Sequence, residues 1–274
     1  MTEADFIERL DSIKCFALDL DGTIYLGNYL FPYTKLFLDK VTETERDYIF
    51  LPNNSSLGPI EYVQKLTSFG LTVEQDQVYT SADATLEYLL NFGPGHRLCV
   101  MGTDPLIRFF ESNGFVIEPD EPDALVLGSD LDFDYSRLLH AARLLKHGVP
   151  FFATHPDATT PIEDGDFMPD CGAISAALTA STGVEPIVLG KPSVHMIEGV
   201  LRRTGLGRSE LAIIGDRLDT DILSGTENDV LSILVLTGET TRQALAKSKI
   251  KPDFVAPSLL GLIRYLDKKA VEKI

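Results

Sequence analysis

One segment near the start of the chain constrains the fold more than any other: an apolar run from Ile13 to Leu18 that ends in Asp19-Leu20-Asp21-Gly22-Thr23. Such a run of large apolar residues predicts a buried strand of a parallel sheet. Carboxylates at the end of a central strand are costly to bury unless they are paired or bound to a cation, and ligands of open α/β sheets bind at that edge. The segment therefore indicates a Mg²⁺ site with a carboxylate free to attack. Taken alone, it leaves open a strand that runs into a solvated Asp-Gly turn.

Length, charge and cysteine content narrow the class of protein. The 274 residues, 44% of them hydrophobic, suffice for one large or two ordinary domains, and no apolar run approaches the roughly 18 residues of a membrane span. The formal net charge of −17 opposes binding to a nucleic-acid backbone. The three scattered cysteines predict neither a disulfide framework nor a structural zinc site, and the first residues lack the pattern of a signal peptide. We expect a cytoplasmic protein that binds neither nucleic acid nor a membrane.

Strands and helices alternate along the rest of the chain, which predicts an α/β fold with a parallel sheet. After the first strand, strands are expected over Tyr48–Leu51, Leu98–Met101, Leu125–Leu127, Phe151–Ala153, Ile187–Leu189, Leu211–Ile214 and Leu231–Val235. Helices are expected over Pro59–Phe69, Ser81–Phe92, Pro105–Asn113, Tyr135–Lys146, Ala173–Thr179, Val194–Arg203, Thr220–Thr226 and Leu259–Asp267. The stretch Thr154 to Asp170, rich in Pro, Asp and Gly, is expected to be a loop.

Two further strand ends carry charged residues. Lys191 follows an apolar strand between Gly and Pro, where a lysine can hold an anion at the sheet edge or simply be exposed at a helix start. Gly215-Asp216 ends another apolar strand, and Asp219, Thr220 and Asp221 follow at the start of a helix, which they could merely cap. Taken with Asp19 and Asp21, these residues favour a Mg²⁺ site, because Mg²⁺ prefers hard oxygen ligands.

The order of these motifs resembles a known family. Asp19-x-Asp21-x-Thr23, the strand before Asn53, Lys191 and Gly215-Asp216 followed by Asp221 are similar to the four motifs of the haloacid dehalogenase-like (HAD) hydrolase superfamily. The branch that the chain resembles is the NagD-like sugar-phosphatase and 4-nitrophenylphosphatase subgroup. Its marks are Asp-Gly-Thr-Ile-Tyr, Asn53-Asn54-Ser55-Ser56, His155-Pro156-Asp157 and Gly-Asp-Arg-Leu-Asp-Thr-Asp-Ile. The resemblance implies a Rossmann-like, doubly wound parallel-sheet core (residues 1–80 and 183–274) with an inserted α/β cap domain (residues 81–182).

The resemblance also implies an activity: Mg²⁺-dependent hydrolysis of small phosphomonoesters, of the sugar phosphate or p-nitrophenyl phosphate type, through an aspartyl-phosphate. Asp19 would be the nucleophile and Asp21 the general acid and then base. The metal ligands would be Asp19 and Asp216 through their carboxylates and Asp21 through its backbone carbonyl. Lys191 would neutralise phosphate oxygens, and Asp221 would orient Lys191 or a metal-bound water. Further residues expected at the phosphate or substrate end are Pro52, Asn53, Asp157, Arg217 and Thr220.

One departure from the family pattern is Pro52, which stands where the second motif normally has Thr or Ser. Proline has neither a hydroxyl nor an N–H, so it cannot donate to a phosphoryl group. We expect the activity to survive at a reduced level. Two alternatives stay open: a phosphomutase, and a weakly active phosphate-ligand binding protein, which Pro52 motivates. The expected partner is a small-molecule phosphate ester, and the protein is expected to be a monomer or a homodimer.

Two residues of the expected cap, Asp157 and His155, need separate interpretations. Asp157 either faces the substrate or stabilises a turn after Pro156. His155, just before it, is interpreted as a structural residue, because the family mechanism does not need a histidine there.

Overall fold

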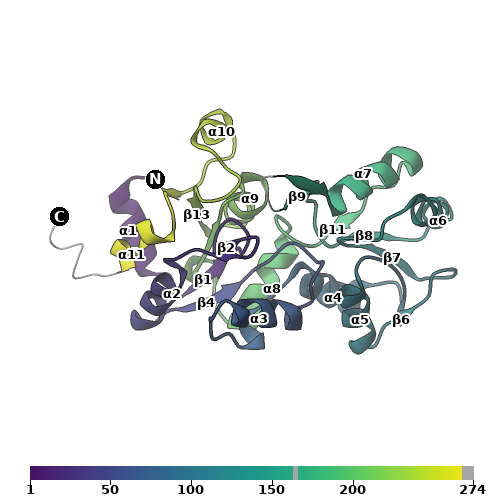
Figure 1. Ribbon diagram of the computed structural model, residues 1–274, viewed down its shortest axis with the longest axis horizontal. Helices are drawn as coiled ribbons and strands as arrows, with labels where there is room; N and C mark the ends of the chain where they lie inside the picture. The colour runs from purple at the N-terminus through teal and green to yellow at the C-terminus, as the bar shows by residue number, and fades with distance from the viewer. Residues whose placement is uncertain (163–165, 267–274) are drawn as a thin grey trace. The chain divides into compact units, whose positions relative to one another are not determined.

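The computed structural model describes residues 1–162 and 166–266, which divide into two compact units. Unit 1 consists of Met1–Pro52, Thr67–Val78 and Ile197–Ile274, and unit 2 of Asn53–Leu66 and Tyr79–Met196. Each unit is built around its own five-stranded parallel sheet (Figure 1). The predicted division into 1–80 with 183–274 and 81–182 stays a prediction.

The sheet of unit 1 has the order β14-β13-β12-β1-β4. Its strands are β1 (Cys15–Leu18), β4 (Asp47–Phe50), β12 (Leu211–Gly215), β13 (Leu231–Val235) and β14 (Phe254–Ala256). From β1 the chain proceeds outward to β4 on one side, and later from β12 outward to β14 on the other. The direction of winding therefore reverses between β1 and β12. The carboxyl ends of these two strands are thus the switch point, where open α/β sheets bind ligands. The predicted Rossmann-like, doubly wound core is confirmed.

Helices and one small hairpin complete unit 1. They are α1 (Glu3–Asp11), β2 (Tyr25–Leu26), β3 (Tyr29–Leu30), α2 (Thr34–Glu43), α9 (Leu223–Glu227), α10 (Arg242–Lys247) and α11 (Leu259–Leu266). Thr2 caps α1 through a capping box with Asp5. Phe6 of α1 stacks on Phe254 of β14, and Tyr265 of α11 meets both rings edge-on. These aromatic contacts fix the two terminal helices against the edge of the sheet.

The sheet of unit 2 has the order β11-β8-β7-β5-β6. Its strands are β5 (Arg97–Met101), β6 (Val116–Ile117), β7 (Ala124–Leu127), β8 (Phe151–Ala153) and β11 (Ile187–Val188). Its helices are α4 (Ser81–Phe92), α5 (Asp104–Ser112), α6 (Tyr135–Lys146) and α7 (Cys171–Thr182), and β9 (Thr159–Pro161) pairs with β10 (Phe167–Pro169). The residues of two further helices, α3 (Pro59–Ser68) and α8 (Val194–Thr204), are divided between the two units.

Alternating side chains bury both faces of this second sheet. Leu98 and Val100 of β5 pack with α4 and α5, whereas Cys99 and Met101 pack with α6 and α7. Figure 1 shows the two helix pairs on opposite sides of the strands. A sheet covered on both faces needs apolar residues at successive positions, which explains the continuous apolar runs. The predicted α/β cap is thereby confirmed.

Several sequence predictions need correction. The stretch Thr154 to Asp170 is not all loop, because it contains the hairpin β9–β10. The helix expected over Thr220–Thr226 begins with a π-helical turn, Leu218–Ile222, and continues as α9. The elements α2, α10 and β14 were not expected at all. The last predicted helix was to end at Asp267, which lies outside the described residues.

No helix in the described part of the chain combines the length and the apolar character needed to cross a bilayer.

Candidate active site

Three carboxylates meet at the switch point of unit 1. β1 and β12 pair in parallel with Leu18 opposite Ile214, and the Asp19 backbone N–H extends the pairing by donating to the Ile214 carbonyl at 2.9 Å. Asp19 and Asp216 therefore follow neighbouring strands at the same edge. One ligand oxygen each of Asp19, Asp216 and Asp221 lies within 4.8 Å of the others. The π-helical turn brings Asp221 into this cluster, where the Arg217 backbone N–H donates to its Oδ2 at 3.1 Å.

Glycines pack tightly around the Asp216 carboxylate. A Cβ at Gly22 would lie 2.6 Å from the Asp216 Cγ, and Gly22 also has a φ of +81° that L side chains rarely adopt. A Cβ at Gly238 would lie 2.0 Å from Asp216 Oδ2 and 2.7 Å from the Gly22 Cα. The backbone N–H of Glu239 donates to Oδ2, and the Thr237 hydroxyl donates to the Gly22 carbonyl at 2.6 Å. The loop after β13 thus holds Asp216 in one position, a role that sequence reasoning missed.

The electrostatics of this cluster favour a bound cation. Asp19, Asp216 and Asp221 are 9%, 3% and 1% exposed. Burial, followed by the charges of Asp19 and Asp221, raises the pKa of Asp216 well above its ordinary value. Its Oδ1 is buried with no hydrogen-bond partner among the residues that the structure describes. Close, buried carboxylates with an unused oxygen fit a hard divalent cation such as Mg²⁺.

Unit 1 also contains the predicted site residues Asp21, Pro52, Arg217 and Thr220. Asp21 is partly exposed and forms a bridge with Tyr25 in the turn after β1. Thr220 is buried in the π-helical turn. The Arg217 Nε lies 3.3 Å from Glu239 Oε2 and 3.7 Å from Asp219 Oδ1, so its charge is balanced by exposed carboxylates. Pro52 is buried just after β4.

A second group of predicted residues is held together within unit 2. The Asn53 side chain accepts from the Lys191 backbone N–H at 2.8 Å and donates to the Lys191 carbonyl at 3.2 Å. It also donates to Asp157 Oδ2 at 2.8 Å. Gly190 allows this approach, because a Cβ there would lie 2.5 Å from the Asn53 Oδ1 and 2.3 Å from the Thr154 carbonyl. Lys191 is 1% exposed, and its peptide bond to Pro192 is cis.

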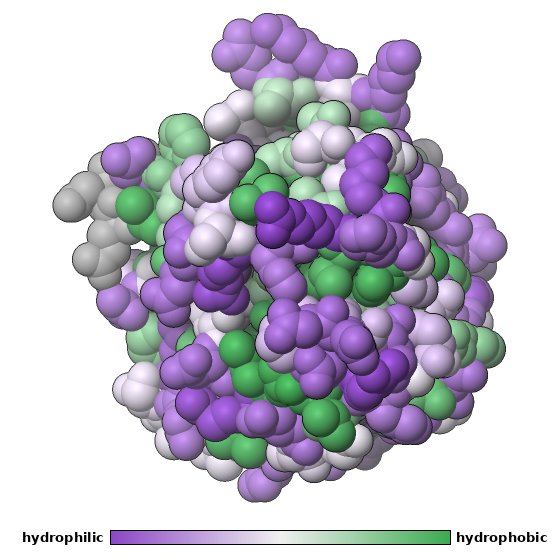
Figure 2. Space-filling model, turned by 90° about the vertical axis from the view of Figure 1, so that its right-hand side faces the viewer, coloured by the Kyte–Doolittle hydropathy of each residue, from purple (hydrophilic) through white to green (hydrophobic). Residues whose placement is uncertain are grey.

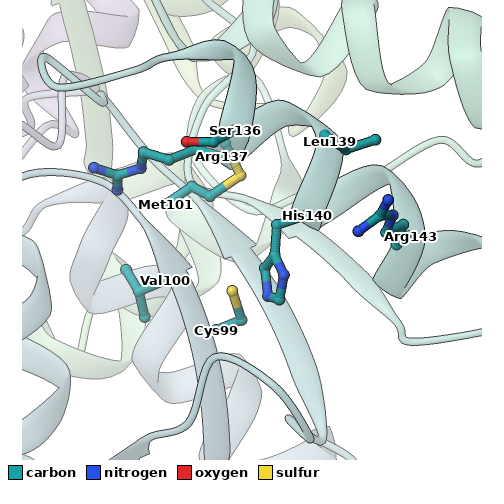
Figure 3. Close-up of a pocket in the computed structure, with 8 residues that line it drawn as sticks. All are labelled: Cys99, Val100, Met101, Ser136, Arg137, Leu139, His140 and Arg143. Atoms are coloured by element: carbon teal, nitrogen blue, oxygen red, sulfur yellow. The ribbon is translucent and has the colours of Figure 1, made fainter.

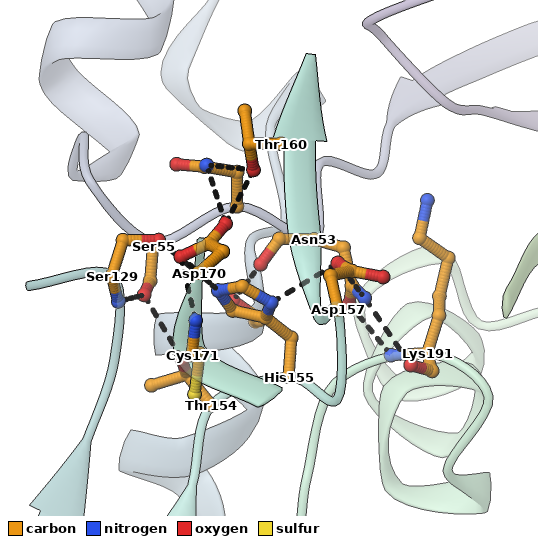
Figure 4. Close-up of polar contacts among 12 residues, drawn as sticks. Asn53, Ser55, Ser129, Thr154, His155, Asp157, Thr160, Asp170, Cys171 and Lys191 are labelled. Carbon is orange, nitrogen blue, oxygen red and sulfur yellow. Dashed lines mark hydrogen bonds and ion pairs between the residues drawn. The ribbon is translucent and has the colours of Figure 1, made fainter. Parts of the chain in front are cut away.

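A buried histidine joins this group (Figure 4). His155 is 0% exposed, and its Nδ1 lies 3.0 Å from Asp157 Oδ2. On the other side of the ring, Nε2 lies 3.2 Å from the Ser129 hydroxyl and 3.8 Å from Asp170 Oδ1. Asp170 caps α7 through the Cys171 N–H. The histidine therefore lies between two buried carboxylates, which the sequence prediction of an ordinary structural residue did not include.

A groove of about 480 Å³ on unit 2 contains none of the predicted site residues. It lies between β5 and α6 and is lined by Cys99, Val100, Met101, Ser136, Arg137, Leu139, His140 and Arg143 (Figure 3). Arg137 is paired with Asp130 at 3.1 Å, and His140 Nε2 contacts the Pro119 carbonyl at 2.7 Å. On the face shown in Figure 2, hydrophobic residues occur in groups separated by hydrophilic ones. We assign no catalytic role to this groove.

Known proteins resemble the chain over most of its length. A haloacid dehalogenase-like hydrolase family matches residues 16–116, and a HAD-hydrolase-like family matches residues 188–262. An acid sugar phosphatase of Staphylococcus saprophyticus is 34% identical over 260 residues, which are 94% of this chain and all of that protein. The chain belongs to the haloacid dehalogenase-like hydrolase family. Within it, the chain is a phosphatase of the NagD-like, 4-nitrophenylphosphatase branch.

Solved structures agree with this family assignment. A 4-nitrophenylphosphatase from Thermotoga maritima superposes with a TM-score of 0.90 at 41% identity, covering 94% of this chain and 99% of that one. A glycerol phosphate phosphatase from Mycobacterium tuberculosis, solved in complex with magnesium, has a TM-score of 0.84 at 28% identity and covers 96% of this chain and 79% of that one.

Proposed function

We propose that the protein hydrolyses small phosphomonoesters, of the sugar phosphate or p-nitrophenyl phosphate type, in a Mg²⁺-dependent reaction through an aspartyl-phosphate. The observation that carries this proposal is the buried cluster of Asp19, Asp216 and Asp221, with one oxygen of each within 4.8 Å of the others. The relatives described above, a sugar phosphatase, a 4-nitrophenylphosphatase and a glycerol phosphate phosphatase, support a small phosphate ester as the substrate.

In the proposed reaction, a carboxylate oxygen of Asp19 attacks phosphorus and the bond from phosphorus to the ester oxygen breaks. Asp21 gives its proton to the leaving oxygen. In the second half, Asp21 accepts a proton from a water molecule that attacks the aspartyl-phosphate, which releases phosphate and restores Asp19. Lys191, Asn53, Arg217 and Thr220 are proposed to bind the phosphate oxygens.

Magnesium would be held by the carboxylates of Asp19 and Asp216 and the backbone carbonyl of Asp21, with Asp221 beside them. When bound, it supplies positive charge against the phosphate and the carboxylates. Asp216 itself is held by the Glu239 amide and by Gly22 and Gly238. The role of the protein is therefore to keep the carboxylate cluster in one arrangement, since phosphoryl transfer is catalysed chiefly by positioning and by stabilising charge.

The test is a phosphatase assay over a panel of phosphorylated metabolites and p-nitrophenyl phosphate, with Mg²⁺ and with a chelator. We expect phosphate release that the chelator abolishes. Asp19→Asn keeps the size of the side chain but removes the anionic nucleophile, so its rate should fall on the order of 10⁴-fold or more. Arg108→Gln, on the exposed surface of α5, should match the wild type. Phosphate release by Asp19→Asn at the wild-type rate would refute the mechanism.

The same assay separates the alternatives. A phosphomutase would move phosphate between positions of one sugar and would require a bisphosphate activator. A binding protein would be stabilised by phosphate esters without releasing phosphate. We also propose a reducing, cytoplasmic setting, which is supported by the three free cysteines Cys15, Cys99 and Cys171.

A further inference from the structure

A continuous series of buried polar contacts leads from His155 to the backbone of Lys191. His155 Nδ1 lies 3.0 Å from Asp157 Oδ2, and the same oxygen accepts from Asn53 Nδ2 at 2.8 Å. The Asn53 side chain in turn forms two hydrogen bonds with the Lys191 backbone. All four residues belong to unit 2, and each is at most 7% exposed.

Asp157 determines which way the Asn53 amide points. A carboxylate only accepts hydrogen bonds, so it must face the NH₂ group of Asn53. With Nδ2 on that side, Nδ2 also reaches the Lys191 carbonyl and Oδ1 receives the Lys191 N–H. A reversed amide would bring oxygen against the Asp157 and Lys191 oxygens, and NH₂ against the Lys191 N–H. One carboxylate thus fixes both hydrogen bonds that hold the Lys191 backbone.

His155 in turn holds Asp157 in place. Asp157 is 7% exposed and a buried charge needs a partner. His155 Nδ1 lies at ion-pair distance from this carboxylate, while Nε2 on the opposite side of the ring is directed to Ser129 and Asp170. Two carboxylates, those of Asp157 and Asp170, and the Ser129 hydroxyl are thus among the groups that face the ring. Asp170 itself accepts hydrogen bonds from Asn54, Thr160 and the Cys171 N–H. The contact between His155 Nε2 and Asp170 therefore belongs to the start of α7.

We propose that His155 is a positioning residue for Lys191, acting through Asp157 and Asn53. The inference rests on the proposed function in one respect: Lys191 is taken to bind the phosphoryl group. Asp157 then acts on the reaction by orienting Asn53, as an alternative to contacting the substrate itself. Replacing a residue that orients a binding group without touching the substrate typically lowers activity by about 10- to 100-fold.

Two substitutions at the same position test the two sides of the ring. Asn carries its amide nitrogen at the same number of bonds from Cβ as His Nδ1, and Gln at the same number as Nε2. His155→Asn therefore keeps a donor for Asp157, whereas His155→Gln keeps one for Ser129 and Asp170 and loses the donor for Asp157. His147→Gln, at an exposed position after α6, controls for the substitution.

The first measurement is hydrogen exchange at the Lys191 amide, which does not depend on activity. In His155→Gln this amide should exchange about 10- to 100-fold faster than in the wild type, and His155→Asn should restore most of the protection. The second measurement is steady-state kinetics. His155→Gln should lower kcat by a similar factor with little change in KM, and the two variants should lose similar amounts of thermal stability.

Three results would overturn the proposal. The first is unchanged protection of the Lys191 amide in His155→Gln, and the second is an equal loss of this protection and of kcat in the Asn and Gln variants. The third is an increase in KM alone, which would place Asp157 against the substrate. If His155→Gln does not fold, Asp157→Ala applies the same exchange test one residue along the series. Absence of phosphate release by the wild-type enzyme would refute the proposed function instead, and the exchange data would still decide the positioning role.

Discussion

The substitution Gly238→Ala tests whether the loop after β13 holds the Asp216 carboxylate in the position that the reaction needs. The added Cβ would lie 2.0 Å from Asp216 Oδ2, 2.6 Å from its Cγ and 2.7 Å from the Gly22 Cα. Ordinary contact begins at 3.4 Å, so the carboxylate and the loop must separate by more than about 1 Å. Asp216 is 3% exposed and bound to the Glu239 N–H, which leaves it little room to yield.

A misplacement of about 1 Å in an active site can cost about 10²-fold in rate. We expect kcat/KM for p-nitrophenyl phosphate to fall by about that factor in Gly238→Ala, and the Mg²⁺ concentration at half-maximal activity to rise. Overpacking should also lower the stability by about 1–3 kcal/mol. Gly207→Ala is the matched control, because the nearest atom to its added Cβ is the Glu210 Oε2 at 3.6 Å. A kcat/KM for Gly238→Ala within threefold of the wild type would refute the reasoning.

Three further predictions concern the site and the core. Pro52→Thr should raise kcat/KM by up to about 10²–10³-fold, because it restores a hydroxyl donor; an unchanged value would mean that another group already fills the role. Because the pKa of Asp216 is raised, the folded protein binds this proton more tightly than the unfolded chain, so its contribution favours folding at low pH and is lost as the pH rises from about 4. In metal-free protein at neutral pH, Asp216→Asn should therefore raise the free energy of unfolding by about 1.4 kcal/mol per pKa unit, and with it Tm. It should also abolish the Mg²⁺-induced rise in Tm; a lower Tm without metal would contradict this. Burial raises the pKa of Cys15 and Cys171 to about 12 and of Cys99 to about 11, so iodoacetamide at pH 8 should label these thiols only after unfolding, as mass spectrometry would show.

The meeting of Asp19 and Asp216 could be predicted from the sequence for a physical reason. Each carboxylate follows an apolar run, and parallel strands present their carboxyl ends at one edge. The resemblance implied that Asp221 orients Lys191 or a metal-bound water, but the π-helical turn Leu218–Ile222 that carries Asp221 into the cluster had no signal in the sequence, because such a turn depends on tertiary packing. The hydrogen bond from the Glu239 N–H to Asp216 had no sequence signal either, since every residue except proline offers a backbone donor.

The contacts of His155 in unit 2 could likewise be predicted only in part from the sequence. Asp157 is close to His155 in the sequence, whereas Asp170 follows the β9–β10 hairpin and contacts the other side of the ring. The Pro- and Gly-rich composition of this stretch predicted a loop, so the hairpin was not expected. The orientation of the Asn53 amide depends on contacts with residues more than a hundred positions away. Such long-range polar contacts leave no periodicity in the sequence, so only the folded structure reveals them.

The pairing of β1 with β12 has a consequence for how the chain is made. β1 begins at Cys15, but its neighbour β12 begins at Leu211. At a synthesis rate of about 5–20 residues per second, β1 leaves the ribosome roughly 10–40 s before β12 exists. During that interval one edge of an apolar strand has no partner and can pair with other chains. Nascent polypeptides should therefore be most vulnerable to aggregation until β12 has left the ribosome.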